Sequence, residues 1–146
     1  MTSLKITALA LTALILAPSA AHLFELPGKM RLDRDAYFVV QSIYAGWALF
    51  GVPILAAILA NGALFVALRR SDRAAARWAL ASALLIALSL AVFFTWTFPA
   101  NQATANWTVA PETWEELRRA WEYSHAANAV IIFAAFLATA AAAARR

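Results

Sequence analysis

The chain has 146 residues, of which 64% are hydrophobic and 14% are charged, whereas a soluble domain has about 45–50% apolar and about 25% charged residues. This composition excludes an ordinary soluble domain and indicates a membrane protein. The absence of Cys excludes disulfides, thiolate metal sites and iron–sulfur clusters. Because the Arg residues flank apolar segments, we assign the net charge of +4 to membrane topology and expect no nucleic-acid partner.

Four apolar segments are each long enough to cross a bilayer, which takes about 20 residues. They lie at about 6–24, 43–68, 78–98 and 126–144. Helices are expected, because a lipid-facing backbone must satisfy its own hydrogen bonds and these segments lack the alternation of barrel strands. The sequence therefore predicts an all-α integral membrane four-helix bundle that forms a single membrane domain over residues 1–146.

The first segment also has features of a cleavable signal peptide. Lys5 precedes its apolar run, and the small residues Ser19 and Ala21 occupy the −3 and −1 positions of a cleavage site before His22. Cleavage would leave a bundle of three helices, so we expect the first span to be retained. The alternative stays open at this point.

Polar residues and prolines mark the second and third segments. Pro53 is expected to kink the second span, and Pro99 to mark the end of the third. Asn61 is an amide in the middle of an apolar run, for which we expect hydrogen bonds between helices.

The loop before the fourth span is predicted to be a short, outward-facing amphipathic helix that runs into that span. Pro111 suits a first helical position, and Glu residues occupy the opening turns. Trp114, Trp121, His125 and Asn128 recur at helical spacing, which places aromatic rings at the membrane interface and polar groups just below it.

Positive charge is unequally divided between the two sides of the predicted bundle. The side of both termini carries seven basic residues, and the other side carries five: Lys29, Arg31, Arg34, Arg118 and Arg119. By the positive-inside rule we expect both termini to be cytoplasmic, in a bacterial cytoplasmic membrane.

Ionisable side chains gather at the outward-facing end. His22 and Glu25 lie at the end of the first span, and Glu122 and His125 lie at the start of the fourth. The three-residue spacing within each pair places both side chains on one helix face. Antiparallel first and fourth spans would bring both pairs to one depth. These four residues are our candidates for catalysis.

Two other interpretations of the same residues are open. A single metal ion bound by His22, Glu25, Glu122 and His125 is the alternative to a site without a cofactor, and a dinuclear site is disfavoured because the second and third spans supply no carboxylate. In the other interpretation, the charged residues serve only in surface ion pairs at four-residue spacing: Glu25 with Lys29, Glu122 with Arg118, and Glu115 with Arg119.

Two groups of residues resemble a family of small four-span membrane proteins, mostly without an assigned reaction, that includes the fungal anthrone oxygenases. In the second half these are Phe98–Asn101, Asn106, Trp107, Trp114, Leu117, Arg118, Trp121, Glu122 and His125; in the first half they are His22–Pro27, Gln41, Tyr44 and Trp47. The resemblance implies a retained first span. For some members it also implies oxygenation of an activated aromatic substrate without a prosthetic group.

The residues present can be assigned roles in that chemistry. His125 or His22 would remove a benzylic proton, with Glu122 or Glu25 orienting the imidazole. We expect the substrate to be a lipophilic molecule bound by Asn101, Asn106, Gln41, Trp107, Trp121, Tyr44 and Asn128, with the amides donating to a developing enolate. The rival hypothesis is a non-catalytic membrane protein, a ligand-binding or interaction module whose partners are the bilayer and a small molecule.

Overall fold

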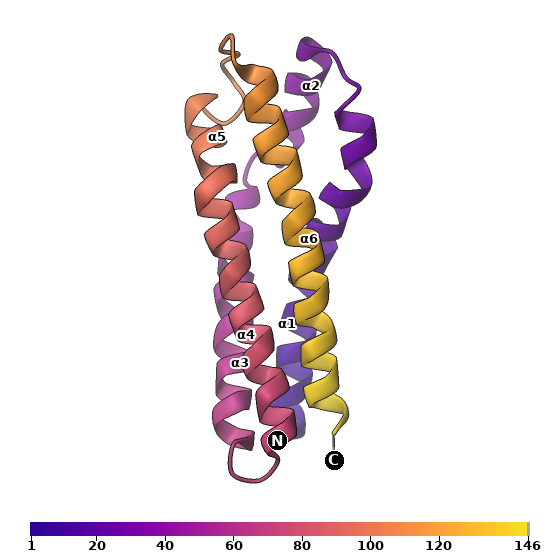
Figure 1. Ribbon diagram of the computed structural model, residues 1–146, viewed down its shortest axis with the longest axis vertical. Helices are drawn as coiled ribbons and strands as arrows, with labels where there is room; N and C mark the ends of the chain where they lie inside the picture. The colour runs from indigo at the N-terminus through magenta and orange to yellow at the C-terminus, as the bar shows by residue number, and fades with distance from the viewer. Residues whose placement is uncertain (146) are drawn as a thin grey trace.

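The computed structural model describes residues 1–145 and consists of helices joined by short connections (Figure 1). Four helical segments are long and apolar enough to cross a membrane: Thr2–Lys29, Trp47–Leu68, Arg73–Ala103 and Trp114–Ala144. No strand occurs in the described part of the chain. The predicted all-α membrane helical bundle is therefore confirmed.

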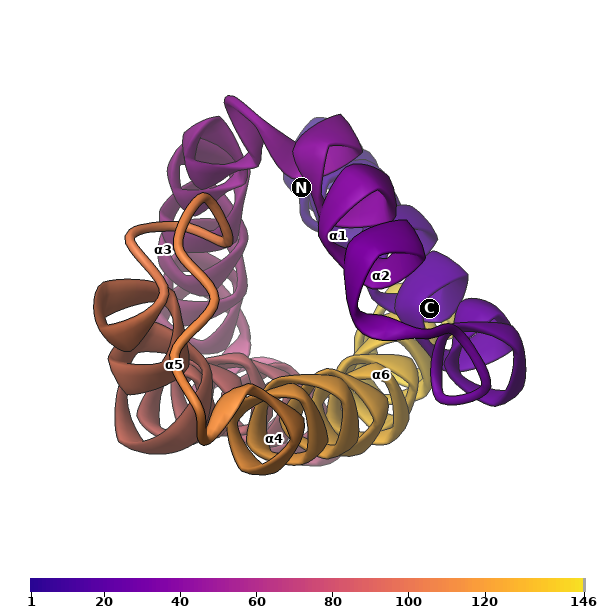
Figure 2. The ribbon, with the colours of Figure 1, turned by 90° about the horizontal axis from the view of Figure 1, so that it is seen from above.

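The four segments are built from five α-helices and short irregular turns. Helix α1 covers Thr2–Lys29, α3 covers Gly51–Leu68, and α6 covers Trp114–Ala144; the third segment comprises α4 (Arg73–Val92), a π-helical turn η3 (Phe93–Thr97) and α5 (Phe98–Ala103). Helix α1 packs against α3 and α6, and α4 packs against α3 and α6. Figure 2 shows these helices arranged around a square, so that neighbours in the sequence are neighbours in space.

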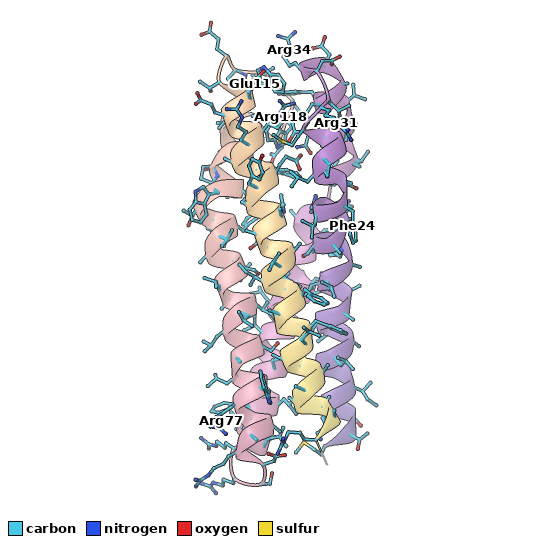
Figure 3. The ribbon with its side chains drawn as sticks, turned by 45° about the vertical axis from the view of Figure 1, so that its right-hand side comes forward. Phe24, Arg31, Arg34, Arg77, Glu115 and Arg118 are labelled. Atoms are coloured by element: carbon cyan, nitrogen blue, oxygen red, sulfur yellow. The ribbon has the colours of Figure 1, made fainter. Side chains whose placement is uncertain are left out.

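Both termini and the α3–α4 turn lie at one end of the bundle (Figure 1). The opposite end, which we call the α2 end, carries the short helix α2 (Arg34–Gln41) and two 3₁₀ turns, η1 (Ser42–Tyr44) and η2 (Trp47–Phe50). Asp33 caps α2 by accepting a hydrogen bond from the Ala36 amide at 2.9 Å. The charged residues labelled in Figure 3 lie towards the two ends, whereas Phe24 points outward from α1.

Small residues and one polar network hold the centre of the bundle together. The Asn61 amide donates to the Thr12 hydroxyl at 3.2 Å and accepts from Thr139 at 3.0 Å, while Ser82 lies 2.7 Å from Thr139. These four buried side chains come from α3, α1, α6 and α4, so the network touches every span. The predicted hydrogen bonding of Asn61 between helices is confirmed.

A second polar group closes the end that carries the termini. Asp72 caps α4 by accepting from the amides of Ala74 and Ala75, and it also accepts from the Arg145 guanidinium at 3.0 Å. Lys5 donates to the Arg145 carbonyl. This arrangement ties both ends of the chain to the α3–α4 turn.

Three sequence predictions about helix ends are corrected. The second span starts later than residue 43, because Gly46 has a left-handed φ of +86° that interrupts the helix. Pro53 consequently lies in the first turn of α3, where its missing N–H breaks no helical hydrogen bond, and not in the middle of a span that it would kink. Pro99 does not end the third span, since it occupies the start of α5 just after the π-helical turn. Helix α6 begins at Trp114, and Pro111 belongs to the preceding turn.

Candidate functional site

Two imidazoles stack at the centre of the α2 end. The ring centroids of His22, on α1, and His125, on α6, lie 4.1 Å apart with an interplanar angle of 26°. Because α1 and α6 are antiparallel neighbours, His22, near the end of α1, and His125, inside α6, lie at one depth. The predicted convergence of the two histidines is confirmed.

A buried ion pair lies beside the imidazoles. Lys29 Nζ is 2.7 Å from Glu122 Oε1, and the two side chains are 5% and 0% exposed. The ammonium also lies over the rings of Trp121 and Tyr44, at 4.3 and 4.6 Å from their centroids. The attraction between the buried carboxylate and the buried ammonium thus offsets the cost of removing both charges from water, among aromatic rings that surround them.

Two phenols extend this pair into a continuous hydrogen-bond network. The Tyr37 hydroxyl donates to Glu122 Oε1 at 2.9 Å and accepts from Gln41 Nε2 at 2.5 Å. The Tyr44 hydroxyl donates to Glu25 and accepts from Lys29 at 3.2 Å. Each phenol therefore joins one carboxylate to a donor from another residue.

Burial raises the pKa of Tyr37 above its ordinary value, and the neighbouring Glu122 carboxylate raises it further. The pKa of Tyr44 is also raised by burial and by its hydrogen bond to Glu25. Both phenols consequently stay protonated at neutral pH and remain hydrogen-bond donors to the carboxylates.

Tryptophan side chains line the site on the side of α5 and α6. The Trp121 ring centroid lies 4.1 Å from that of His125 and 5.1 Å from that of His22. Asn101 Oδ1 accepts from the indole nitrogens of both Trp121 and Trp107, at 2.9 and 3.0 Å. The Asn101 carbonyl thus positions two indoles, and the expected role as a hydrogen-bond donor to substrate belongs to its amide nitrogen.

The turn that carries Asn106 has an unusual backbone. Ala105, Asn106 and Trp107 have φ values of +48°, +57° and +64°, in the left-handed region that L residues rarely adopt. Trp107 is buried in the aromatic cluster, whereas Asn106 is exposed. The structure thus places Asn106 at the surface, because the turn that buries the indole of Trp107 leaves the Asn106 side chain in solvent.

Two of the three predicted ion pairs are wrong. Glu115 and Arg119 do pair on the surface of α6, at 3.7 Å. Lys29, however, pairs with Glu122 of α6 rather than with Glu25, and Arg118 donates to the Leu32 carbonyl at 2.8 Å rather than to Glu122. Both differences arise because the packing of α1 against α6 offers these long side chains partners that are distant in sequence.

The expected orientation of each imidazole by its own helix's glutamate is also corrected. Glu122 is held by Lys29 and Tyr37, and the described residues show no hydrogen bond from it to His125. Glu25 Oε2 lies 4.0 Å from His22 Nδ1, beyond hydrogen-bond distance. The histidines are therefore positioned by ring packing, and the glutamates by the phenols and the lysine.

A metal centre made of His22, Glu25, Glu122 and His125 is not supported by this arrangement. Within residues 1–145, no group of three or more His, Asp or Glu side chains is placed to hold one metal ion. The Glu122 carboxylate faces the Lys29 ammonium, which would repel a cation at that position.

Several buried polar atoms of the site have no hydrogen-bond partner among the described residues. They are His22 Nδ1, Gln41 Oε1, Glu122 Oε2 and Asn128 Oδ1, together with Arg118 Nε at the rim. Buried polar atoms in native proteins are nearly always paired, so each exception needs an explanation, such as a bound water, local strain or a functional role. Four of these five atoms come from residues that the sequence predicted to be catalytic or substrate-binding.

Two residues of the site were missing from the predicted set. Lys29 follows His22 and Glu25 at spacings of seven and four residues, so the helical periodicity of α1 already placed it on the same face. Tyr37 precedes Gln41 by four residues on α2, which is a similar signal. A further residue, Trp47, packs against the site, with its ring centroid 5.5 Å from that of His22.

The fold and the site together define a four-helix integral membrane protein with a stacked histidine pair and a buried Lys–Glu pair at one end of the bundle. No family model, curated protein or solved structure matches the chain.

Proposed function

We propose that this protein is a membrane oxidoreductase that oxygenates a lipophilic aromatic carbon acid, an anthrone-like compound, without a prosthetic group. The observation that carries the proposal is the stacked pair of His22 and His125 beside the buried Lys29–Glu122 pair. Such a site combines a proton acceptor with a fixed positive charge at the depth where a lipophilic substrate would reside. The resemblance to the family that includes the anthrone oxygenases points to the same chemistry.

The reaction balances without an added cofactor. One anthrone and one O₂ give one anthraquinone and one water. The base removes a proton from the benzylic carbon, and the resulting enolate transfers an electron to O₂ and forms a carbon–oxygen bond. The peroxide anion takes back the first proton from the base and becomes a hydroperoxide. Loss of the second benzylic proton to the base then breaks the O–O bond and leaves a carbonyl, and the departing hydroxide takes that proton to form water.

The residues divide this work between proton transfer and charge stabilisation. His125 is the proposed base, since it is partly exposed whereas His22 is buried. Lys29 supplies positive charge near the enolate and the peroxide, which develop negative charge. Glu122 and the Tyr44 hydroxyl hold the ammonium in place.

The test measures oxygen uptake and proton abstraction separately. Purified protein in nanodiscs is given anthrone, and O₂ consumption is recorded; in a parallel anaerobic sample, exchange of the benzylic proton with D₂O is followed by NMR. We expect His125→Gln to slow both processes by about 10²–10⁴-fold, the usual contribution of a general base. Tyr123→Phe is the matched control, because Tyr123 is an exposed residue of α6 two positions away.

Thermal unfolding of each variant separates lost chemistry from lost structure. A folded wild-type protein that neither consumes O₂ nor exchanges the proton would refute the proposal and favour a non-catalytic binding module. Retained O₂ uptake in a folded His22→Gln/His125→Gln variant would refute the role of the imidazoles.

We also propose that both termini face the cytoplasm and that the α2 end faces outward. The excess of basic residues at the end that carries the termini supports this orientation. The chain has no native Cys, so a single Cys introduced at Ser71 can be labelled selectively. Labelling of this Cys in intact cells by a membrane-impermeant maleimide would overturn the proposed orientation.

A further inference from the structure

A hollow of about 390 Å³ lies next to the histidine pair, on the outside of the bundle. It is lined entirely by apolar residues and glycine: Ala45, Gly46, Trp47, Leu49, Phe50 and Pro53. It is shallow and open on its outer side, so a ligand in it would keep one face exposed.

The hollow forms where the helical path of the second span is interrupted. The chain leaves η1 at Tyr44, turns at Gly46 and resumes a regular α-helix only at Gly51. A Cβ at Gly46 would meet no atom within 4 Å, so glycine is needed there for its φ of +86° and not for space. The interruption leaves a concavity at the depth of the site instead of a continuous helix surface.

Trp47 is the wall between this hollow and the histidine pair. Its ring lines the hollow, and its centroid lies 5.5 Å from that of His22 and 4.9 Å from that of Tyr44. Phe50 packs on the same indole at 5.4 Å and also lines the hollow. A flat ring in the hollow would therefore lie one aromatic layer away from His22, which stacks on the proposed base His125.

The surface around the hollow is apolar. Leu49, in its lining, is 75% exposed, and the flanking residues Ile43 and Val52 are 57% and 69% exposed. Exposed side chains of this kind on a membrane-spanning segment contact lipid rather than water. The hollow thus opens towards the bilayer, where a water-soluble or charged molecule would not be found.

We infer that the substrate is an uncharged planar aromatic molecule that enters sideways from the bilayer through the hollow of Ala45–Pro53 and reaches the histidine pair past Trp47. This inference rests on the proposed function for what happens at the histidines. The route and the class of ligand rest on the hollow itself.

A second hollow of the same protein provides a matched comparison. It has a volume of about 490 Å³ and lies between η3 and α6, where Trp96, Tyr123 and Ala127 are among its lining residues. In the described structure neither of these two aromatic side chains contacts an imidazole ring. A ligand drawn only to apolar hollows would occupy both, whereas the substrate route requires the first.

The experiment uses photolabelling, which needs no turnover. The full chain in nanodiscs is irradiated with an anthraquinone that carries a diazirine, and the labelled peptides are mapped by mass spectrometry. We expect label in 45–53. Ala45→Trp and Leu49→Trp, which fill the hollow with an extra ring, should each reduce this labelling by about tenfold or more, while Ala127→Trp should leave it unchanged.

Steady-state kinetics with anthrone complete the test. The two filling variants should raise KM with little change in kcat, because they obstruct binding and leave the histidines untouched. Label confined to the second hollow, or labelling of 45–53 that persists in both folded filling variants, would overturn the inference even if the wild type turns over. Label in 45–53 without any turnover would leave the route standing and refute the proposed function instead.

Discussion

The buried Lys29–Glu122 pair makes a strong prediction about stability. In Lys29→Met the Glu122 carboxylate stays fully buried with no counter-charge, and in Glu122→Gln the Lys29 ammonium is left in the same position. Removal of one partner from a buried pair costs about 3–5 kcal/mol. The unfolding constant should therefore rise more than about a hundredfold, since each 1.4 kcal/mol is a tenfold change.

The double variant Lys29→Met/Glu122→Gln removes both charges and keeps an acceptor for the Tyr37 hydroxyl. Because no uncompensated charge remains, we expect it to be more stable than either single variant, so that the two single losses are not additive. Glu115→Gln is the control, because it breaks an ion pair on the same helix whose side chains are more than half exposed. Its effect should stay within about 0.5 kcal/mol.

The assay is reversible unfolding in mixed detergent micelles, followed by circular dichroism for the four proteins and the control. If Lys29→Met lowers the free energy of unfolding no more than Glu115→Gln does, the Lys29–Glu122 pair is not buried away from water in the way that the structure shows. Strict additivity of the two single variants would likewise refute the reasoning, because it would mean that the two charges do not interact.

Three further predictions concern other parts of the bundle. Asn61→Leu removes the centre of the network among the four spans, and we expect it to lower the free energy of unfolding by about 1–2 kcal/mol in the same assay; no loss would show that the network is not stabilising. Hydrogen bonds from two backbone amides and from the Arg145 guanidinium lower the pKa of Asp72 in the folded protein. The ionised carboxylate therefore stabilises the folded protein above the unfolded pKa of about 3.9, and this stabilisation is lost as the pH falls through the lower folded pKa. Melting curves between pH 2 and pH 5 should therefore show a smaller pH dependence for Asp72→Asn, and an unchanged dependence would contradict this assignment. Ala105→Gly relieves a left-handed residue and should raise the melting temperature. Ala103→Gly, at the last helical residue of α5, removes no such strain and should not raise it. A decrease for both variants would disprove the strain at Ala105.

The sequence alone predicted the elements of this protein, because those depend on local properties. Runs of apolar residues about 20 long predict spanning helices whatever their partners, and the helical stripe from Trp114 to Asn128 predicted the extension of the fourth span beyond the membrane. The spacing of His22 with Glu25 and of Glu122 with His125 placed each pair on one face of its helix. Asn61, an amide in an apolar run, needed a partner on another helix wherever the helices lay.

Only the tertiary structure decided which helices are neighbours and which side chains meet. The sequence left open whether α1 and α6 are adjacent or diagonal, and their adjacency is what stacks the two imidazoles. Lys29 can reach a carboxylate one turn away or one on another helix, and local spacing favoured Glu25, whereas packing buried it against Glu122. The interruption at Gly46 and the hollow beside Trp47 likewise appear only in the assembled structure, because the packing of the helices decides which partners lie within reach of a long side chain or a turn.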